Sequence, residues 1–442
     1  MNFSKINLPR FSVASAILLA AASLFQVQAD VEVNGAGWFQ YGRIGHSSDP
    51  EIGKDLKGTS IYSSGAQLSA QTKLSEKVDG IAGIGVYFGQ NVPDLSTNGG
   101  YAPSFLAPYV SQANFTAHFI KEEDDALFLR VGLFDYDYNP EVQNLGLYLL
   151  RGPLYPGVLL SGFEQRETLP VASLLGLQLH NRIGSFEHDF ILNSETDFFP
   201  YFDLSPAYIA AYHFGSALRI GAGVNFYHLI PITDSISNGK WTTKSYYHDT
   251  TGGKNDSTLL GFQGTKLMVN AALDPKALFG GSEMLGAEDL KIYGEVGLFG
   301  TNNDALHKKL FGDMLHRMPM MIGFNIPAFK LLDRLAFETE WYGSPIADDL
   351  ATFDHTASNI QTPIPATDAN GNFVNHKRDN WKWSLYGSRV IQSHVKVSFQ
   401  AANDHFRPGI YTGDGDNAPP KTRSLMTTPK DWYTMLKVAY FF

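Results

Sequence analysis

The feature that most constrains the fold is an alternation of apolar and polar residues, which recurs in windows of about ten residues from Val31 to Phe442. In one window, Ile220 and Val224 fall on one side of the alternation and Arg219 on the other. A period of two is typical of a β-strand with one apolar and one polar face, and a one-residue slip would exchange the faces. The clearest windows are 66–74, 126–134, 218–227, 290–299, 335–343, 381–388, 395–402 and 431–442.

Two kinds of connection alternate between the windows. Short turns are expected at 75–79, 121–125, 182–185, 215–216, 328–333 and 388–393, with a longer segment at 274–288. Long polar segments are expected at 46–58, 91–107, 135–169, 195–205, 231–257, 301–316, 346–377 and 404–429. Turns therefore gather at one end of the sheet and loops at the other, with about sixteen strands in all. The sequence predicts an all-β fold, a closed antiparallel transmembrane β-barrel with short periplasmic turns and long extracellular loops.

The first 29 residues have the pattern of a secretory signal peptide. Lys5 and Arg10 precede the apolar run 11–25, and Val27-Gln28-Ala29 forms a small-residue cleavage pattern. A transmembrane anchor is the alternative, but the run is shorter than the roughly 20 residues that a span requires. We therefore expect a signal peptide at 1–29 and a single barrel domain over 30–442. The chain contains no cysteine, which excludes disulfide bonds and a lipid anchor on cysteine.

Composition excludes two other classes of protein. Removal of residues 1–29 takes away two basic residues and no acidic one, which changes the net charge from −10 to −12. A chain this acidic is not suited to nucleic acid. Beyond Phe25 no uninterrupted apolar stretch approaches bilayer length, so a helical membrane protein is excluded. The 13% aromatic content and 42 glycines suit all-β packing.

The two ends of the mature chain are expected to pair with each other. In hydrocarbon each unpaired backbone N–H or C=O costs several kcal/mol, so a sheet crosses a bilayer only when it closes. The windows 31–41 and 431–442 are the natural partners.

Aromatic residues near strand ends suit the headgroup zone; they are Trp341, Tyr342, Trp381, Trp383, Trp432, Tyr440 and Phe442. A soluble β-sandwich also alternates and is the alternative fold, but it requires neither the signal peptide nor the asymmetry of turns and loops.

Together, the signal peptide, the alternating strands, the asymmetry of turns and loops and the terminal Tyr440-Phe441-Phe442 resemble Gram-negative outer-membrane porins of the general type. The resemblance implies a location in the outer membrane, with the lipid bilayer, lipopolysaccharide and the barrel-assembly machinery as partners, and a homotrimer. It also implies that Phe442 is the assembly signal and that the third long loop, 135–169, folds into the lumen. The chain lacks the P-E-F-G-G stretch of enteric general porins, so the fine geometry of the constriction is not implied.

The loop 135–169 carries both charges and apolar stretches. The apolar stretches 145–150 and 154–160 need a surface to bury against, and the barrel wall offers one. A lid packed on neighbouring loops or on a partner subunit is the alternative. The candidate constriction residues are Asp135, Asp137, Glu141, Arg151, Glu164, Arg166 and Glu167.

Charged residues at lumen-facing positions are expected to oppose the loop. The candidate wall residues are Lys73, Arg130, Arg219, Lys266, Lys291, Glu295, Glu338, Glu340, Lys382, Lys396 and Lys437, with Glu32, Glu187 and Asp189 as further acids. We expect Glu338 and Glu340 to be wall charges paired beside lumen lysines. Opposed rows of acids and bases create a transverse field across a narrow wet passage. The mixed signs predict modest selectivity, with a leaning to cations.

The sequence therefore predicts a passive or mildly selective diffusion channel for ions and small hydrophilic solutes. The alternative is a plugged barrel with an adhesive or structural role through its external loops. We predict no enzyme, since no G-x-S-x-G elbow occurs. No cofactor or metal site is predicted: H-E-x-x-H is absent, and the segment at Gly252 lacks the leading glycine of a phosphate loop. The segments at Asp368 and Asp414 lack the bidentate glutamate of an EF-hand and indicate turns, with a weakly bound calcium that stabilises the loops as the alternative.

Overall fold

The computed structural model describes most of the mature chain. The described residues are 31–47, 56–89, 105–121, 125–150, 172–194, 202–230, 232, 244–249, 256–261, 264–280, 283–301, 312–344, 380–406, 409–410, 421–422 and 425–442. The predicted signal peptide and the turn-like segments at Asp368 and Asp414 lie outside these residues.

Sixteen strands in the described residues form one closed antiparallel barrel, which confirms the predicted fold class. The barrel strands are β1 (Val31–His46), β2 (Ser60–Ser75), β3 (Val78–Gly89), β4 (Phe105–Lys121), β5 (Asp125–Tyr136), β6 (Ala172–Ile183), β7 (Phe186–Ser194), β8 (Leu204–Phe214), β9 (Leu218–Tyr227), β12 (Gly264–Leu273), β13 (Ile292–Leu298), β14 (Met320–Asn325), β15 (Arg334–Trp341), β16 (Trp381–Ile391), β17 (Val395–Asn403) and β20 (Trp432–Phe441).

The other elements lie in the connections. They are the pairs β10 (Lys244–Asp249) with β11 (Asp256–Gly261) and β18 (Gly409–Ile410) with β19 (Lys421–Thr422), and the 3-10 helices η1 (Pro275–Leu278) and η2 (Met314–Arg317). The sequence analysis missed both strand pairs, because they lie in polar segments that were taken as loops. No helix among the described residues is long and apolar enough to span a bilayer.

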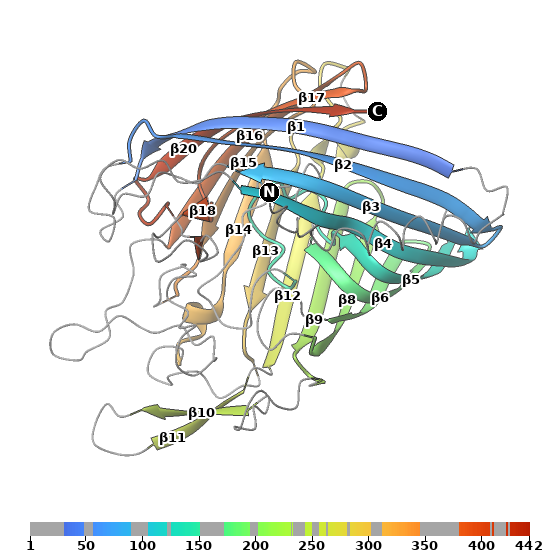
Figure 1. Ribbon diagram of the computed structural model, residues 1–442, viewed down its shortest axis with the longest axis vertical. Coiled ribbons are helices and arrows are strands. Elements are labelled where there is room, and N and C mark those ends of the chain that lie inside the picture. Colours follow the sequence, from blue (N-terminus) through green and yellow to red (C-terminus); the bar gives the residue numbers. More distant parts are fainter. Residues whose placement is uncertain are drawn as a thin grey trace, which may run out of the picture.

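The first and last strands close the barrel, as predicted (Figure 1). Phe39 lies opposite Val438, and Gln40 lies opposite Lys437. Beyond the end of β20, the Phe442 N–H donates to the Gly35 carbonyl at 3.0 Å, and the Gly35 N–H donates to the Phe442 carbonyl at 2.8 Å. The backbone of Phe442 therefore extends the ladder that joins the two strands.

Short and long connections alternate around the barrel, in agreement with the sequence. Two residues separate β2 from β3 and β6 from β7, whereas 35 positions lie between the end of β5 at Tyr136 and the start of β6 at Ala172. The connection from β12 to β13 is the longer one on the turn side and contains η1. Both chain ends of the barrel, Val31 and Phe441, lie on the turn side because the strand number is even.

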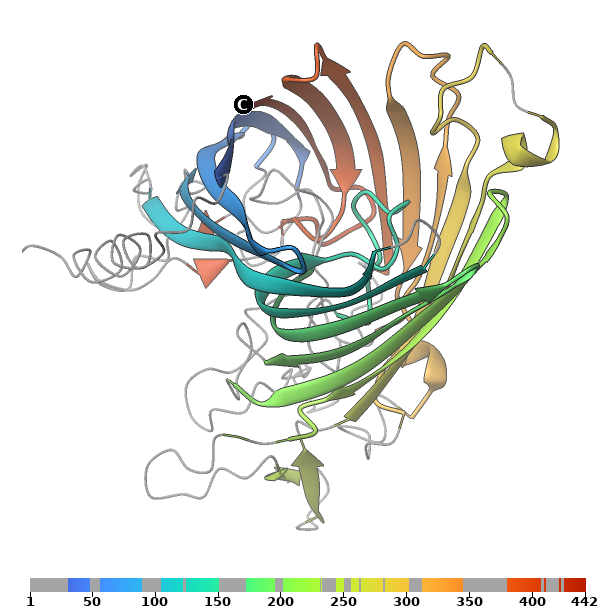
Figure 2. The same ribbon diagram turned by 90° about the vertical axis from the view of Figure 1, so that its right-hand side faces the viewer.

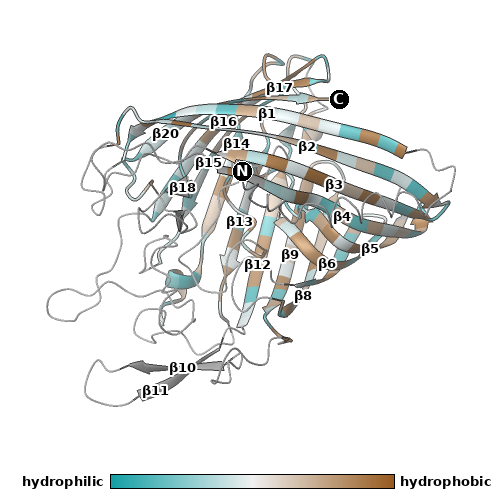
Figure 3. Ribbon diagram, in the orientation of Figure 1, coloured by the Kyte–Doolittle hydropathy of each residue, from teal (hydrophilic) through white to brown (hydrophobic). Residues whose placement is uncertain are grey.

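Along the closing strand the outward-facing positions are mostly apolar while Lys437 faces inward, and apolar and polar residues alternate along parts of other strands as well (Figure 3). Leu436 and Val438 are 50% and 41% exposed, while Lys437 between them is 3% exposed. Among the aromatic residues expected at the headgroup zone, Trp381, Trp432, Tyr440 and Phe442 are exposed. Tyr342 is a correction: it is buried and packs edge-on against Phe299 inside the barrel, at a centroid distance of 6.2 Å.

Substitution of Val438 by proline is expected to prevent closure of the barrel. Val438 lies between Phe39 of β1 and Val397 of β17, and proline in the middle of a sheet removes a ladder hydrogen bond. The measurement is the fraction of refolded protein that migrates as a compact, heat-sensitive band on detergent gels. Val438→Thr keeps the N–H and should fold normally. Equal folding of Val438→Pro and wild type would contradict the closure argument.

Candidate functional site

The segment that follows β5 lies inside the ring of strands (Figure 2). The structure describes its residues 137–150. Val142, Leu145, Leu147 and Leu149 are fully buried against inward-facing wall residues. Of the predicted constriction residues, Arg151, Glu164, Arg166 and Glu167 lie outside the described part of the chain. Inward folding of the whole loop 135–169 therefore stays a prediction.

Two wall glutamates hold the backbone of this segment. Glu338 accepts hydrogen bonds from the backbone N–H groups of Gln143, Asn144 and Leu145 at 2.6, 2.9 and 2.9 Å. Glu295 accepts from the N–H groups of Leu147 and Tyr148 at 3.2 and 2.7 Å. A loop inside a barrel has no ladder to satisfy its backbone, and carboxyl oxygens can accept several N–H bonds at once. The two glutamates therefore replace the missing backbone partners.

Side chains add a second set of bonds. The Tyr148 hydroxyl donates to Glu340 at 2.8 Å, and His405 contacts the same carboxylate at 2.6 Å. Asn144 donates to Asp404 at 2.6 Å. Burial, together with the Glu340 charge, raises the pKa of the Tyr148 hydroxyl well above its ordinary value. Tyr148 therefore stays protonated and remains a hydrogen-bond donor.

These contacts correct the expected role of the wall acids. Glu338 and Glu340 were expected beside lumen lysines, but they bind the segment 137–150 and residue His405. Three of the lysines are buried as well. Lys266 lies over the Tyr227 ring at 4.5 Å, Lys437 lies over the Trp38 ring at 5.8 Å, and Lys382 donates to the Met426 carbonyl. Alternation along a strand gives the inward face but not the part of it that a loop covers.

Apolar packing supports the same segment from the other side. Val142, Leu145 and Tyr148 form one cluster with wall residues, and Leu147 and Leu149 join a second; the wall members include Tyr293, Phe299 and Met321 in the first cluster and Phe134, Leu174, Ile191 and Ile209 in the second. Each fully buried leucine contributes about 1.5–3 kcal/mol of hydrophobic free energy. The apolar stretch 145–150 is thus buried, as its composition requires.

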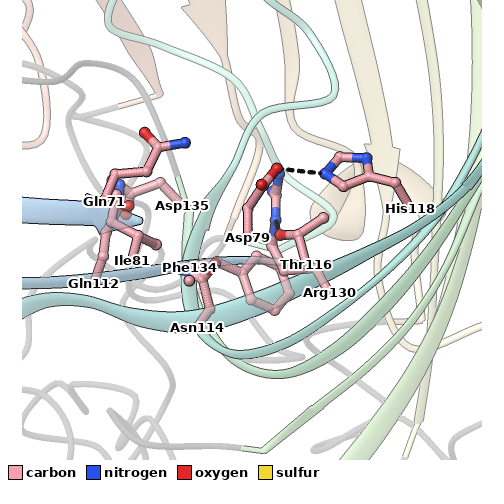
Figure 4. Close-up of a pocket in the computed structure, with 11 residues that line it drawn as sticks. Gln71, Asp79, Ile81, Gln112, Asn114, Thr116, His118, Arg130, Phe134 and Asp135 are labelled. Carbon is pink, nitrogen blue, oxygen red and sulfur yellow. Dashed lines mark hydrogen bonds and ion pairs between the residues drawn. The ribbon is translucent and has the colours of Figure 1, made fainter. Parts of the chain in front are cut away.

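The opposite part of the wall is open. A cavity of about 310 Å³ lies on the inner face of β2 to β5 (Figure 4). His118 and Asp79 are joined at 2.9 Å, as the dashed line in Figure 4 marks. Arg130 donates to Thr116 at 3.3 Å. Asp135 accepts from Gln112 at 3.4 Å, so the cavity carries acids and bases on one polar surface.

A second cavity of about 330 Å³ lies toward the turn side. Its lining includes Asp137 and Glu141 of the loop segment and Arg219, Lys291 and Glu187 of the wall. The Lys291 ammonium donates to Glu141 at 2.9 Å, and Arg219 donates to the Tyr138 carbonyl at 2.8 Å. Acids of the loop and bases of the wall therefore face one another here.

The strand register places the predicted wall residues on the inward-facing side. Lys291 is the exception, because it lies directly before the first residue of β13. Lys73 lies opposite Asp79 and is exposed, and Lys396 lies opposite Val390 near the turn end. The residues at inward positions are Lys73, Arg130, Arg219, Lys266, Glu295, Glu338, Glu340, Lys382, Lys396 and Lys437. Their role in a pore stays a prediction.

Sequence reasoning missed several polar residues of this interior. Asp79 was expected in the turn 75–79, but it lies in β3, and His118 lies in β4, where register shifts break the alternation. Asp404 and His405 follow β17 in a segment read as an external loop. Asp79 lies in line with Arg130 across the paired strands, so an alternation followed from Arg130 would have placed Asp79 on the inward face. No local pattern marks Asp404 or His405.

The turn side of the segment is fixed by a charged cluster of four residues, Glu141, Glu288, Lys291 and Arg334. Lys291 donates to Glu288 at 3.1 Å, and Arg334 donates to Glu288 as well. Burial opposes the charge of Glu288, but Arg334 and Lys291 outweigh it and lower the pKa of the Glu288 carboxyl. Burial opposes the charge of Lys291 too, but its bonds to Glu141 and Glu288 outweigh it and raise the Lys291 pKa. The cluster thus favours the charged form of both groups.

No protein-family model and no curated protein matches the sequence. Solved structures do match. A mutant porin of Rh. blastica is similar with a TM-score of 0.44 and 9% identity over 93% of this chain and 100% of that chain. The Salmonella typhi OmpF complex with daunomycin is similar with a TM-score of 0.46 and 9% identity over 93% and 97% of the two chains. The closed order of sixteen antiparallel strands in this chain defines it as a closed β-barrel protein.

Removal of the Glu338 carboxylate is expected to release the segment 137–150. Glu338→Ala leaves three backbone N–H groups without an acceptor, at a cost of about 1–3 kcal/mol for each one that stays buried. The chain has no cysteine, so Val142→Cys places a single thiol at a fully buried position. Its labelling by a water-soluble maleimide should accelerate roughly tenfold or more when Glu338→Ala is added, because local opening becomes easier. Glu32→Ala, at an exposed carboxylate of β1, is the control, and equal labelling in both backgrounds would refute the anchor.

The cluster around Glu288 is expected to give a pH-dependent contribution to stability. Because the folded-state pKa of Glu288 lies below its ordinary value of 4.5, its contribution is complete above that value and is lost as pH falls through the lowered pKa. The difference in unfolding free energy between wild type and Glu288→Gln should therefore be largest near neutral pH and vanish in acid. Chemical denaturation in detergent at a series of pH values measures it. Glu283→Gln, at an exposed carboxylate of the same connection, should give a flat difference, and a flat profile for Glu288→Gln would count against the cluster.

Proposed function

We propose that this protein is an outer-membrane porin that passes ions and small hydrophilic solutes by passive diffusion. The observation that carries the proposal is the pair of polar cavities on the inner face of the closed barrel, at β2 to β5 and at the turn side. The segment 137–150 packs against other parts of the wall and borders the second cavity, so solutes would pass through the spaces that it leaves open. The protein acts as a channel, without a catalytic step.

The outer surface supports a place in the outer membrane. A closed sheet has no unpaired edge, which lipid would penalise. Outward-facing apolar residues such as Phe39, Leu68, Val110 and Val438 are exposed and suit the hydrocarbon of the bilayer. The lipid bilayer and lipopolysaccharide are then the surroundings of the barrel. Phe442 would serve as the signal for the barrel-assembly machinery.

Small outward-facing residues support a homotrimer. Gly37 lies opposite Ala66, and Ala82 lies opposite both Ala70 and Ala113, which gives the outer face of β1 to β4 a patch of low relief. Small residues let backbones approach closely inside a membrane. A monomeric mass from light scattering of the natively extracted protein would reject the trimer.

The charges of the passage favour modest selectivity. Asp135, Asp137 and Glu141 supply the acidic side of the proposed constriction, while Arg130 and Arg219 supply the basic side. Opposed charges orient dipolar solutes without excluding ions of either sign. The alternative function, a plugged barrel that displays its external loops for adhesion or structure, is favoured by the extensive burial of the segment 137–150.

Single-channel recording in planar bilayers tests the proposal and its charges together. Wild type should give stable conductance steps. Arg130→Gln removes a positive charge from the cavity and should shift the reversal potential in a salt gradient toward cation selectivity, whereas Asp135→Asn should shift it the opposite way. Lys330→Gln, at an exposed residue of the β14–β15 turn, is the charge-matched control and should leave the potential unchanged. Absence of steps from correctly folded, heat-modifiable protein would favour the plugged barrel.

A further inference from the structure

Four metal-binding side chains meet on the inner face of three neighbouring strands. His180 of β6 contacts Asp189 of β7 at 2.9 Å, between Nδ1 and a carboxylate oxygen. His213 of β8 contacts Glu187 of β7 at 3.1 Å, between Nε2 and a carboxylate oxygen. Glu187 and Asp189 are two residues apart on one strand and so share a face. The candidate ligand atoms of His180, Glu187 and Asp189 all lie within 4.8 Å of one another.

The surroundings hold His180 in an orientation suited to a metal ligand. Asp189 binds its Nδ1, and the Phe128 ring stacks on the imidazole at a centroid distance of 4.6 Å. Tyr136 and Gln178 donate to Asp189 at 2.9 and 2.8 Å, which fixes the carboxylate in turn. Within the described residues, Nε2 of His180 has no hydrogen-bond partner. A carboxylate that orients a histidine through one ring nitrogen and leaves the other free is the usual arrangement behind a metal-bound imidazole.

Glu187 and His213 complete the set from the side of the cavity. One oxygen of Glu187 binds His213, and within the described part of the chain its other oxygen has no hydrogen-bond partner. Both residues line the cavity of about 330 Å³ at the turn side, so an ion in the barrel has access to them. The site is therefore open to solution on one side and supported by β6 and β5 on the other.

Nearby arginines do not occupy the carboxylates. Arg182 lies opposite Glu187 across the strands but donates to the Gly184 carbonyl at 3.4 Å. Arg219 lies opposite His213 and donates to the Tyr138 carbonyl, and Arg130 donates to Thr116 and Gln178. Among the described residues, the ion-pair partners of Glu187 and Asp189 are histidines. These positive charges lower the affinity for a cation without blocking the ligands.

We propose that His180, Glu187 and His213 bind a divalent transition-metal ion on the lumen wall, with Asp189 as the residue that orients His180. Imidazole and carboxylate ligands together suit Zn²⁺, and also Ni²⁺ and Cu²⁺. Candidate ligand atoms of His180 and Glu187 lie within 4.8 Å of each other, and His213 contacts Glu187 at 3.1 Å, so Glu187 would stand between the two histidines. Zinc bonds of about 2.0–2.2 Å require the three side chains to rotate toward a shared ion. The site goes beyond the proposed diffusion function and does not depend on conductance.

Zinc titration of the folded full-length barrel in detergent tests the site. Competition with a chromophoric zinc indicator gives affinity and stoichiometry. Wild type should bind one zinc ion. The zinc affinity should fall at least tenfold in each of the variants His180→Gln, Glu187→Gln and His213→Gln. His118→Gln is the matched control, since His118 also bonds a lumen carboxylate, Asp79, but belongs to no group of three candidate metal ligands among the described residues. It should bind zinc as wild type does. Heat-modifiable mobility on detergent gels confirms that each variant is folded.

Two outcomes would overturn the proposal. Unchanged zinc affinity in the His180, Glu187 and His213 variants would show that these residues do not bind the metal, as would an equal loss in His118→Gln. Zinc block of single-channel current in wild type that is absent in Glu187→Gln would link the site to the passage. A barrel that conducts no current would contradict the proposed diffusion function, but the zinc titration would still test the metal site.

Discussion

The pairing of β1 with β20 is the interaction on which the rest of the structure depends. A sheet with open edges would leave two rows of backbone N–H and C=O groups unpaired, and in hydrocarbon each would cost several kcal/mol. Closure removes both edges, because the strand order forms a ring, and the alternation of apolar and polar residues specifies the register of the strands within it. Once the register is fixed, alternate residues face a single enclosed interior. The charged inner wall is a consequence of closure rather than a separate feature.

The interior then has to satisfy a second demand. A chain segment inside the ring has no strand to pair with, and its backbone needs acceptors as much as that of any other segment. Glu295 and Glu338 supply them, and apolar residues of the segment 137–150 pack against the wall around them. Carboxylates that would otherwise line a wet passage become buried supports. Residues 137–150 therefore fill the space against parts of β5 to β8 and β12 to β15, while cavities stay open at β2 to β5 and at the turn side.

The open part combines two kinds of chemistry. Acids and bases that face each other, such as Glu141 and Lys291, give a polar surface with little net preference for charge. Histidines bonded to carboxylates, such as His180 to Asp189, add the ligand types that we propose hold a transition-metal ion. A barrel with both can pass small solutes and also hold a metal ion against its wall. These roles require different residues and can be separated experimentally.

The sequence by itself determined the closed antiparallel barrel, the alternation of turns and loops, the pairing of the two terminal windows and the inward face of each wall residue. These follow from periodicity and from the cost of unpaired backbone, which act locally or at the chain ends. Only the tertiary structure decided that Glu338 binds a loop rather than a lysine, that Tyr342 points into the core, and that His180, Glu187 and His213 meet. Those contacts join residues far apart along the chain, and one-dimensional patterns carry no information about which loop covers which part of a wall.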